Sequence, residues 1–187
     1  MIRKTIHISG FLIPLSFVQI WGHYLVSGIL FLVTILYLLS EVARKYGMNF
    51  PVFQSVTCKA AKSVFEINHF VTAPITFTLG IIISLLIFPP SVAYTSIAVL
   101  TLGDGFASIF GRIFGKTPIH FNKKKTLEGT ICGFACAFLG SILFVNPLKA
   151  LVAVSAGMLA ESLPLPIDDN LVIPFSTGMA LIVFSLL

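Results

Sequence analysis

The chain has 187 residues, of which 57% are hydrophobic and 10% are charged, and its mean hydropathy is +1.01. Soluble domains contain ~45–50% apolar and ~25% charged residues, so a soluble fold of this length is excluded. The net charge of +5 does not indicate nucleic-acid binding, because the basic residues border apolar spans and are not interleaved with stacking aromatic residues. We predict an all-α, polytopic membrane helix bundle that forms one domain over residues 1–187.

Seven apolar segments follow one another along the chain and predict about seven transmembrane helices. Several are shorter than the ~20 residues that cross a bilayer without tilt, so their boundaries are approximate. They cover residues 6–21, 24–40, 71–88, 92–110, 127–145, 148–163 and 171–187. Between the second and third, residues 50–68 place Lys59, Lys62 and Glu66 opposite apolar side chains. That pattern is typical of an amphipathic helix at the membrane interface.

The basic residues predict an orientation for these segments. Lys and Arg near the ends of spans are retained on the cytoplasmic side. A cytoplasmic N-terminus places every Lys and Arg except Lys149 inside, which is 11 of the 12. All seven Asp and Glu fall on the same side, although acidic residues contribute little to orientation. Either the inner loops are simply the long ones, or a catalytic site lies at the cytoplasmic membrane surface.

The fourth apolar segment contains an ionisable residue, Asp104. Such a residue within an apolar span costs roughly 2.5–3.5 kcal/mol on insertion scales and is a functional candidate for that reason. In a continuous helix, Asp104, Ser108 and Arg112 are spaced by four residues and share one face. The alternative interpretation is that Asp104 and Arg112 only neutralise charge near the interface.

The residues after this segment resemble part of a phosphate-binding P-loop, since Gly115 is followed by Lys116 and Thr117. The full pattern requires glycine where the chain has Phe110, and it should follow a buried strand. Here it follows a membrane helix. We therefore exclude a nucleotide-binding fold of that type and keep Arg112 and Lys116 as candidate phosphate contacts.

A second cluster, Lys123 to Lys125, leads into the fifth apolar segment, with Thr126 as the expected N-cap. Three lysines beside the positive end of a helix repel its macrodipole unless an anion lies between them. The arrangement therefore suits a polyphosphate. The alternative, equally supported by these residues, is a topology anchor on anionic lipid headgroups at ~1 kcal/mol per Lys.

A third cluster, Asp168, Asp169 and Asn170, stands at the N-terminus of the last apolar segment. Negative charge is favoured at that position, but capping needs one carboxylate and not two. Oxygen ligands of this kind suit Mg2+, which usually takes one or two carboxylates together with substrate phosphates.

Together these clusters resemble the motifs of the polyprenol kinase family, which includes dolichol kinases, phytol kinases and CTP-dependent diacylglycerol kinases. The resemblance covers nearly the whole chain. It rests on Gly103-Asp104-Gly105 with Ala107-Ser108, on Lys124-Lys125-Thr126 with Glu128-Gly129-Thr130, on Glu161-Ser162, on Asp168-Asp169-Asn170, and on Arg3-Lys4 with His7. It implies a multi-pass membrane enzyme that transfers the γ-phosphoryl group of a nucleoside triphosphate, typically CTP, to a lipid hydroxyl.

Phosphoryl transfer requires cations for the phosphates, a bridging metal ion and an acceptor for the hydroxyl proton. The catalytic candidates are Asp104, Glu128, Asp168 and Asp169, and of these Asp104, Asp168 and Asp169 are the expected Mg2+ ligands. The candidates for nucleotide and phosphate binding are Gly103, Gly105, Ser108, Arg112, Lys116, Lys123, Lys124, Lys125 and Thr126. Further candidates for the site are Arg3, Lys4, His7, Glu161 and Asn170.

The stretch from Lys124 to Thr130 looks closest to the dolichol kinase version of the motif. We therefore predict a CTP-dependent kinase of dolichol or polyprenol, whose partners are a nucleoside triphosphate and a membrane-embedded lipid alcohol. The expected location is a prokaryotic cytoplasmic membrane or the endoplasmic reticulum, with the active site on the cytoplasmic side. The alternatives are a phytol, geranylgeraniol or diacylglycerol kinase, a membrane cytidylyltransferase, and a non-enzymatic transporter. A transporter would be expected to show symmetric halves, and no internal repeat is visible.

The predicted orientation can be checked by labelling single cysteines in intact cells. In a cysteine-free background, a cysteine at Lys124 should be protected from an impermeant reagent, whereas one at Lys149 should react, because the two residues face opposite sides. Labelling at Lys124 from outside would overturn the orientation.

Overall fold

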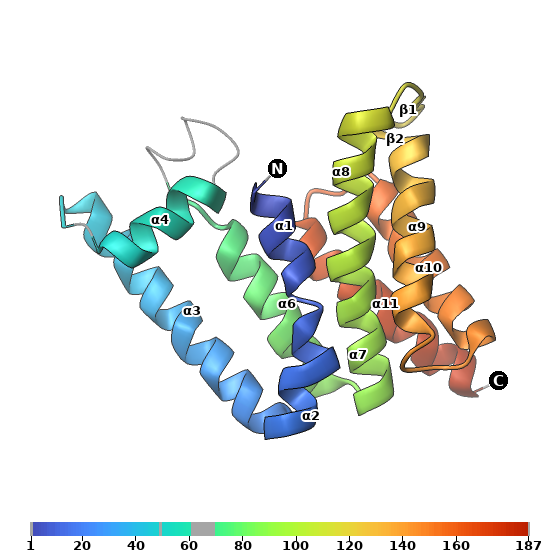
Figure 1. The fold of residues 1–187 in the computed structure, drawn as a ribbon, viewed down its shortest axis with the longest axis horizontal. Coiled ribbons are helices and arrows are strands. Elements are labelled where there is room, and N and C mark those ends of the chain that lie inside the picture. The colour runs from blue at the N-terminus through green and yellow to red at the C-terminus, as the bar shows by residue number, and fades with distance from the viewer. Residues whose placement is uncertain (1, 49, 61–69, 187) are drawn as a thin grey trace.

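The structure is a computed structural model that describes residues 2–48, 50–60 and 70–186. The chain forms a helical bundle with one small hairpin, so the predicted all-α class is confirmed (Figure 1). In chain order the elements are α1 (Ile2–Ser9), η1 (Ile13–Phe17), α2 (Val18–Trp21), α3 (His23–Lys45), α4 (Pro51–Ala60), α6 (Ala73–Ile87), α7 (Pro90–Ala98), η2 (Val99–Asp104), α8 (Gly105–Phe114), β1 (Pro118–Ile119), β2 (Asn122–Thr126), α9 (Leu127–Ser141), α10 (Pro147–Ser162) and α11 (Asp169–Leu186). Each of the seven predicted apolar segments contains helix.

Within the described ranges, three stretches are long and apolar enough to cross a membrane: His23–Lys45, Pro90–Phe114 and Asp169–Leu186. Two further apolar helices, Ala73–Ile87 and Leu127–Ser141, are shorter. The outer face of α3 carries large apolar side chains that are exposed, such as Tyr24 at 81%. This apolar surface is suited to contact with lipid. In water, leaving it exposed would lose about 25 cal/mol of hydrophobic stabilisation for each Å² of apolar area. The number of membrane crossings and their orientation stay predictions.

The first apolar segment is not one helix, as its composition suggested, but three short pieces. Pro14 lies at the start of the π-helical turn η1, where its ring and missing N–H interrupt regular α-helical bonding. The segment ends at Gly22, whose φ of 77° lies in the left-handed region that glycine adopts readily. The predicted amphipathic helix over residues 50–68 is matched in its first part by α4, and residues 61–69 lie outside the described residues.

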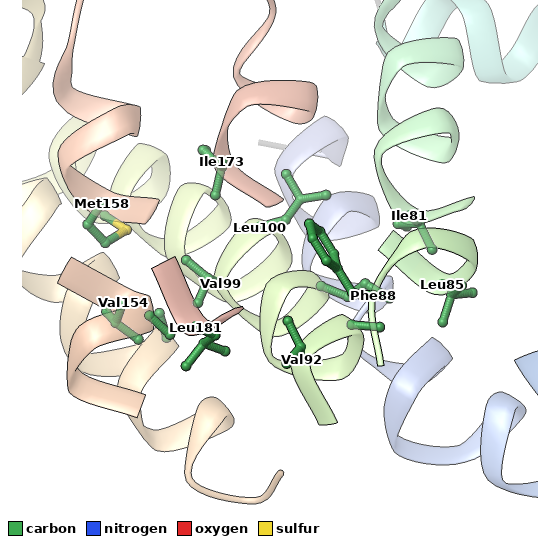
Figure 2. Close-up of a cluster of buried hydrophobic side chains, with 14 of the residues drawn as sticks. Ile81, Leu85, Phe88, Val92, Val99, Leu100, Val154, Met158, Ile173 and Leu181 are labelled. Atoms are coloured by element: carbon green, nitrogen blue, oxygen red, sulfur yellow. The ribbon is translucent and has the colours of Figure 1, made fainter. Parts of the chain in front are cut away.

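The hydrophobic core joins α6, α7, η2, α10 and α11, as the labelled side chains of Figure 2 show. Ile97, Leu100 and Ile173 are completely buried there. Figure 1 places the N-terminus, α4 and the β1–β2 hairpin at one end of the bundle and the C-terminus at the other. The predicted cluster Lys123 to Lys125 belongs to β2 of this hairpin and therefore lies at the same end as the N-terminus.

Glycines allow α9 to approach η2 and α8 closely. A Cβ added at Gly133 would lie 2.5 Å from the carbonyl oxygen of Gly103 and 2.7 Å from the Cβ of Ala107. Neither distance is sterically acceptable, so even alanine would push the helices apart. Small residues at such steps are typical of membrane helix pairs.

We expect Gly133→Ala to destabilise the protein by about 1–3 kcal/mol, the usual cost of overpacking a well-packed interface. Thermal unfolding in detergent measures the effect. The matched control is Gly28→Ala on α3, where an added Cβ meets nothing within 4 Å, so its stability should be unchanged or slightly raised. Equal melting temperatures for the two variants would contradict this account of the α8–α9 interface.

Candidate active site

Asp104 lies where the long helix Pro90–Phe114 changes its winding. The π-helical segment η2 ends at this residue, and α8 continues directly from it. π-Helical turns inside α-helices are rare and occur frequently at functional sites. The carboxylate is only 2% exposed, and a charge in that position requires partners.

The first partners of Asp104 come from α1. Lys4 and His7 are three residues apart and therefore share one face of this helix. The Nζ of Lys4 donates a hydrogen bond of 2.5 Å to Oδ2 of Asp104, and Nε2 of His7 lies 3.3 Å from the same oxygen. The His7 nitrogen is also 3.1 Å from the carbonyl oxygen of Leu100. The hydroxyl of Ser108 donates a hydrogen bond of 3.3 Å to Oδ1 of Asp104. The two side chains therefore share one helix face, one turn apart, as predicted.

Lys125 brings three carboxylates from three different elements together. Its Nζ donates hydrogen bonds to Glu161 of α10 and, at 2.9 Å, to Oδ2 of Asp169 of α11. It also lies 3.9 Å from Oδ1 of Asp104. Burial alone would lower the pKa of Lys125, but the negative charges of Glu161, Asp104 and Asp169 outweigh it and raise the pKa. Lys125 is therefore a fixed positive charge at physiological pH.

These groups line one cavity of about 1130 Å³, which exceeds the ~300–1,000 Å³ of typical small-molecule sites. The lining combines basic and acidic side chains at the charged end of the bundle. The charged residues in it are Arg3, Lys4, Arg112, Lys124, Lys125, Asp104, Glu161, Asp168 and Asp169, and Ser108, Thr126 and Asn170 also line it. Cations on both sides of such a cavity can neutralise the charge of a polyphosphate.

The residues of the cavity can hold a divalent metal ion only if a bound ligand supplies further oxygen atoms to the metal. In the part of the chain that the structure describes, no three His, Cys, Asp or Glu side chains are close enough to hold a metal by themselves. However, Oε2 of Glu161 is buried and has no hydrogen-bond partner, which is unusual for a carboxylate. Glu161 and Asp169 together provide the one or two carboxylates that Mg2+ takes beside substrate phosphates.

The predicted metal ligand Asp168 has a local role in the structure. Its Oδ1 accepts a hydrogen bond of 3.0 Å from the backbone N–H of Asn170, at the start of α11. This is the capping role that one of the two aspartates was expected to have. Glu161, which the sequence suggested only as a further candidate, accepts a hydrogen bond directly from Nζ of Lys125.

The described lining of this cavity does not include three other predicted site residues, Lys116, Lys123 and Glu128. The carboxylate of Glu128 accepts hydrogen bonds of 3.1 and 3.2 Å from the backbone N–H of Thr117, and so fastens the hairpin to α9. Thr126 accepts from Gly129 N at 3.3 Å, which confirms it as the N-cap of α9.

Gly103 and Gly105 are also outside the described lining. A Cβ at Gly103 would lie 2.8 Å from the sulfur of Met158, and one at Gly105 would lie 2.5 Å from Cγ1 of Ile8. Both glycines serve close packing around Asp104. They make room for α1 and α10 to approach the π-helical segment.

Two polar contacts around the site were not predicted from the sequence. Asn122 donates from its side-chain amide to the carbonyl oxygen of Ser162 at 3.0 Å, which ties the hairpin to the end of α10. Thr76 accepts from Nδ2 of Asn170 at 3.0 Å and ties α6 to α11. Both contacts join residues far apart in the chain, and nothing in their local sequence signals them.

The chain is similar to lipid kinases among known proteins. It is 28% identical over 155 residues to a probable phytol kinase, chloroplastic, of Triticum aestivum, which covers 71% of this chain and 50% of the relative. It is 28% identical over 201 aligned positions to a farnesol kinase, chloroplastic, of Arabidopsis thaliana, which covers 96% of this chain and 64% of the relative. A CTP-dependent diacylglycerol kinase of Schizosaccharomyces pombe is 32% identical over 118 residues, 54% of each chain.

These similarities confirm the resemblance of the sequence to the polyprenol kinase family. The chain spans about half to two thirds of the length of these relatives. No model of a protein family matches the chain, and no solved structure matches it.

The central position of Lys125 predicts that it is required for binding a triphosphate. Saturating magnesium CTP should stabilise the wild-type protein in detergent, by about 2.7 kcal/mol when the ligand is at 100 times its Kd. We expect Lys125→Met to lose most of this stabilisation. Thermal unfolding with and without ligand measures it, and Lys149→Met, at the other end of the bundle, should keep the full effect. Undiminished stabilisation of Lys125→Met would show that the cavity does not bind phosphate through this residue.

Proposed function

We propose that this protein is a membrane lipid-alcohol kinase that transfers the γ-phosphoryl group of CTP, or of another nucleoside triphosphate, to the hydroxyl of an isoprenoid alcohol. The observation that carries the proposal is the meeting of Lys4, Lys125 and the buried carboxylate of Asp104 in one cavity at the end of an apolar bundle. Such a site places phosphate-binding charge beside the surface at which a membrane-embedded alcohol presents its hydroxyl. The names of the relatives support the same activity.

The relatives favour a phytol- or farnesol-type acceptor over dolichol. Two of them are named for phytol and farnesol, whereas the dolichol preference rested on the Lys124 to Thr130 motif alone. The diacylglycerol kinase of Schizosaccharomyces pombe makes diacylglycerol a second candidate acceptor, and its name supports CTP as the donor.

The basic residues of the cavity would hold the donor. Arg112, Lys124 and Lys125 line it from α8 and the hairpin, so they can contact the three phosphates from two sides. Glu161 and Asp169 would hold Mg2+ against the same phosphates. When bound, this ion neutralises the charge that develops during phosphoryl transfer.

Asp104 would accept the proton of the lipid hydroxyl. The hydroxyl oxygen forms a bond to the γ-phosphorus, its proton passes to Asp104, and the bond from the γ-phosphorus to the bridging oxygen breaks to release the nucleoside diphosphate. Lys4 and His7 hold the carboxylate in a single orientation. Preorganised groups of this kind cost no rearrangement during the reaction.

Purified protein with labelled CTP or ATP tests the proposal directly. The acceptors to compare are phytol, farnesol, geranylgeraniol, dolichol, a shorter polyprenol and diacylglycerol. We expect a lipid monophosphate with phytol or farnesol. If none of the alcohols is phosphorylated with either nucleotide, the kinase assignment is wrong.

Asp104→Asn tests the role of the carboxylate. The substitution keeps size and polarity but removes the charge, so membrane insertion should be intact or slightly eased. We expect kcat to fall at least about a hundredfold, because every ~1.4 kcal/mol of lost transition-state stabilisation is a factor of ten. Lys149→Ala should change little. Retained activity, or loss of Asp104→Asn from the membrane, would mean that Asp104 is structural.

A further inference from the structure

A second, apolar cavity of about 250 Å³ lies between α1, α3 and α6, below α4. Its wall contains the aromatic side chains of Phe53 and Phe77 and the aliphatic side chains of Val33 and Ile75. The hydroxyls of Thr34 and Thr78, which also line it, are 2.8 Å apart and donate to carbonyl oxygens of their own helices. Their hydrogen bonds are satisfied internally, so the cavity is suited to hydrocarbon.

This apolar cavity adjoins the charged one. Arg3 and Asn170 line both cavities. His7 lines the apolar cavity, and its Nε2 is 3.3 Å from the Oδ2 of Asp104, which lines the charged cavity. The apolar cavity and the charged cavity therefore meet at Asp104, the carboxylate proposed to accept the proton.

The apolar cavity also reaches the outer, apolar surface of the bundle. Ile6 of α1 and Val33 of α3 line it, yet they are 48% and 45% exposed. They mark a lateral opening between these two helices. A lipid can enter there directly from the bilayer, with the remainder of its chain staying in the membrane.

A buried polar network holds the wall of the cavity at its α4 end. The hydroxyl of Tyr37 donates to the carbonyl oxygen of Val71 at 3.2 Å and lies 3.2 Å from the hydroxyl of Thr57. Thr57 donates to the carboxylate of Glu41, which is buried and also accepts from the backbone N–H of Val71. These bonds fix α3 against α4, so the cavity is preformed.

We propose that this cavity binds the carbons next to the hydroxyl of a single-chain isoprenoid alcohol, which enters between α1 and α3 and reaches Asp104 past Arg3, His7 and Asn170. The inference rests on the proposed function and names its acceptor class. A volume of about 250 Å³ falls just below the ~300–1,000 Å³ of drug-sized sites. It suits one narrow chain and discriminates against the two chains of diacylglycerol.

Photocrosslinking tests the cavity without requiring catalysis. A farnesol analogue with a diazirine near its hydroxyl should label peptides of α1, α3 and α6 in the wild-type protein. An excess of phytol or farnesol should suppress the labelling, and diacylglycerol should not. Labelling confined to other helices would overturn the assignment of the cavity, and equal suppression by diacylglycerol would overturn the single-chain selectivity.

Val33→Trp tests the same cavity in the kinase reaction, because the larger side chain fills the lateral opening. We expect the KM for farnesol to rise at least tenfold while the KM for the nucleotide is unchanged. The control is Leu39→Trp on the same helix, since Leu39 is 58% exposed and lies outside both described linings; its kinetics should match the wild type. An active wild-type enzyme with identical kinetics for both variants would contradict the cavity assignment. A wild-type protein that labels in the cavity but phosphorylates no alcohol would instead overturn the proposed function.

Discussion

The ion pairs of Asp104 hold the charged end of the bundle together. Asp104 and Glu161 are almost completely buried, and a buried carboxylate is costly unless a cation compensates it. Lys4 and Lys125 supply that compensation, and they come from the N-terminal helix and the hairpin. The cluster therefore joins α1, η2, β2, α10 and α11 at one point. Replacing a buried ion cluster by apolar residues of similar volume is often neutral or stabilising, so the proposed phosphate site gives a reason for keeping these charges.

The apolar pattern was sufficient to locate the helices but not their irregularities. A run of apolar residues predicts a helix because every backbone polar group must be satisfied within a membrane-spanning segment. The apolar pattern alone does not reveal the break that Pro14 imposes through its ring and missing N–H, nor the π-helical turn before Asp104. The hairpin was missed for a different reason. Its second strand, Asn122–Thr126, is polar and lacks the alternation of apolar and polar residues by which strands are recognised.

The candidate site was predictable in its residue types and less so in their arrangement. The sequence identified Asp104, Lys125 and Asp169, which the structure brings to one cation-centred cluster. It gave equal weight to Glu128, whose carboxylate bonds instead to the backbone of Thr117. The difference arises because a motif names neighbouring residues, whereas the hairpin decides which of their side chains turn inward. Glu161 was underestimated for the same reason, since its contact with Lys125 spans 36 positions.

The proposed kinase activity requires two environments in one protein, because polyphosphates require cations and water while the acceptor chain requires hydrocarbon. Here the two environments are formed by largely different elements, and α1 contributes to both. The hairpin, α8 and the loop before α11 line the charged cavity, whereas α1, α3, α4 and α6 form most of the apolar one. Only Arg3 and Asn170 line both in the described structure. If the apolar cavity binds the acceptor as proposed, changes in α3 and α6 would alter the accepted lipid without disturbing the proposed phosphate site. Such a division would allow proteins of similar sequence to differ in their acceptors, as the names phytol kinase, farnesol kinase and diacylglycerol kinase indicate for the relatives.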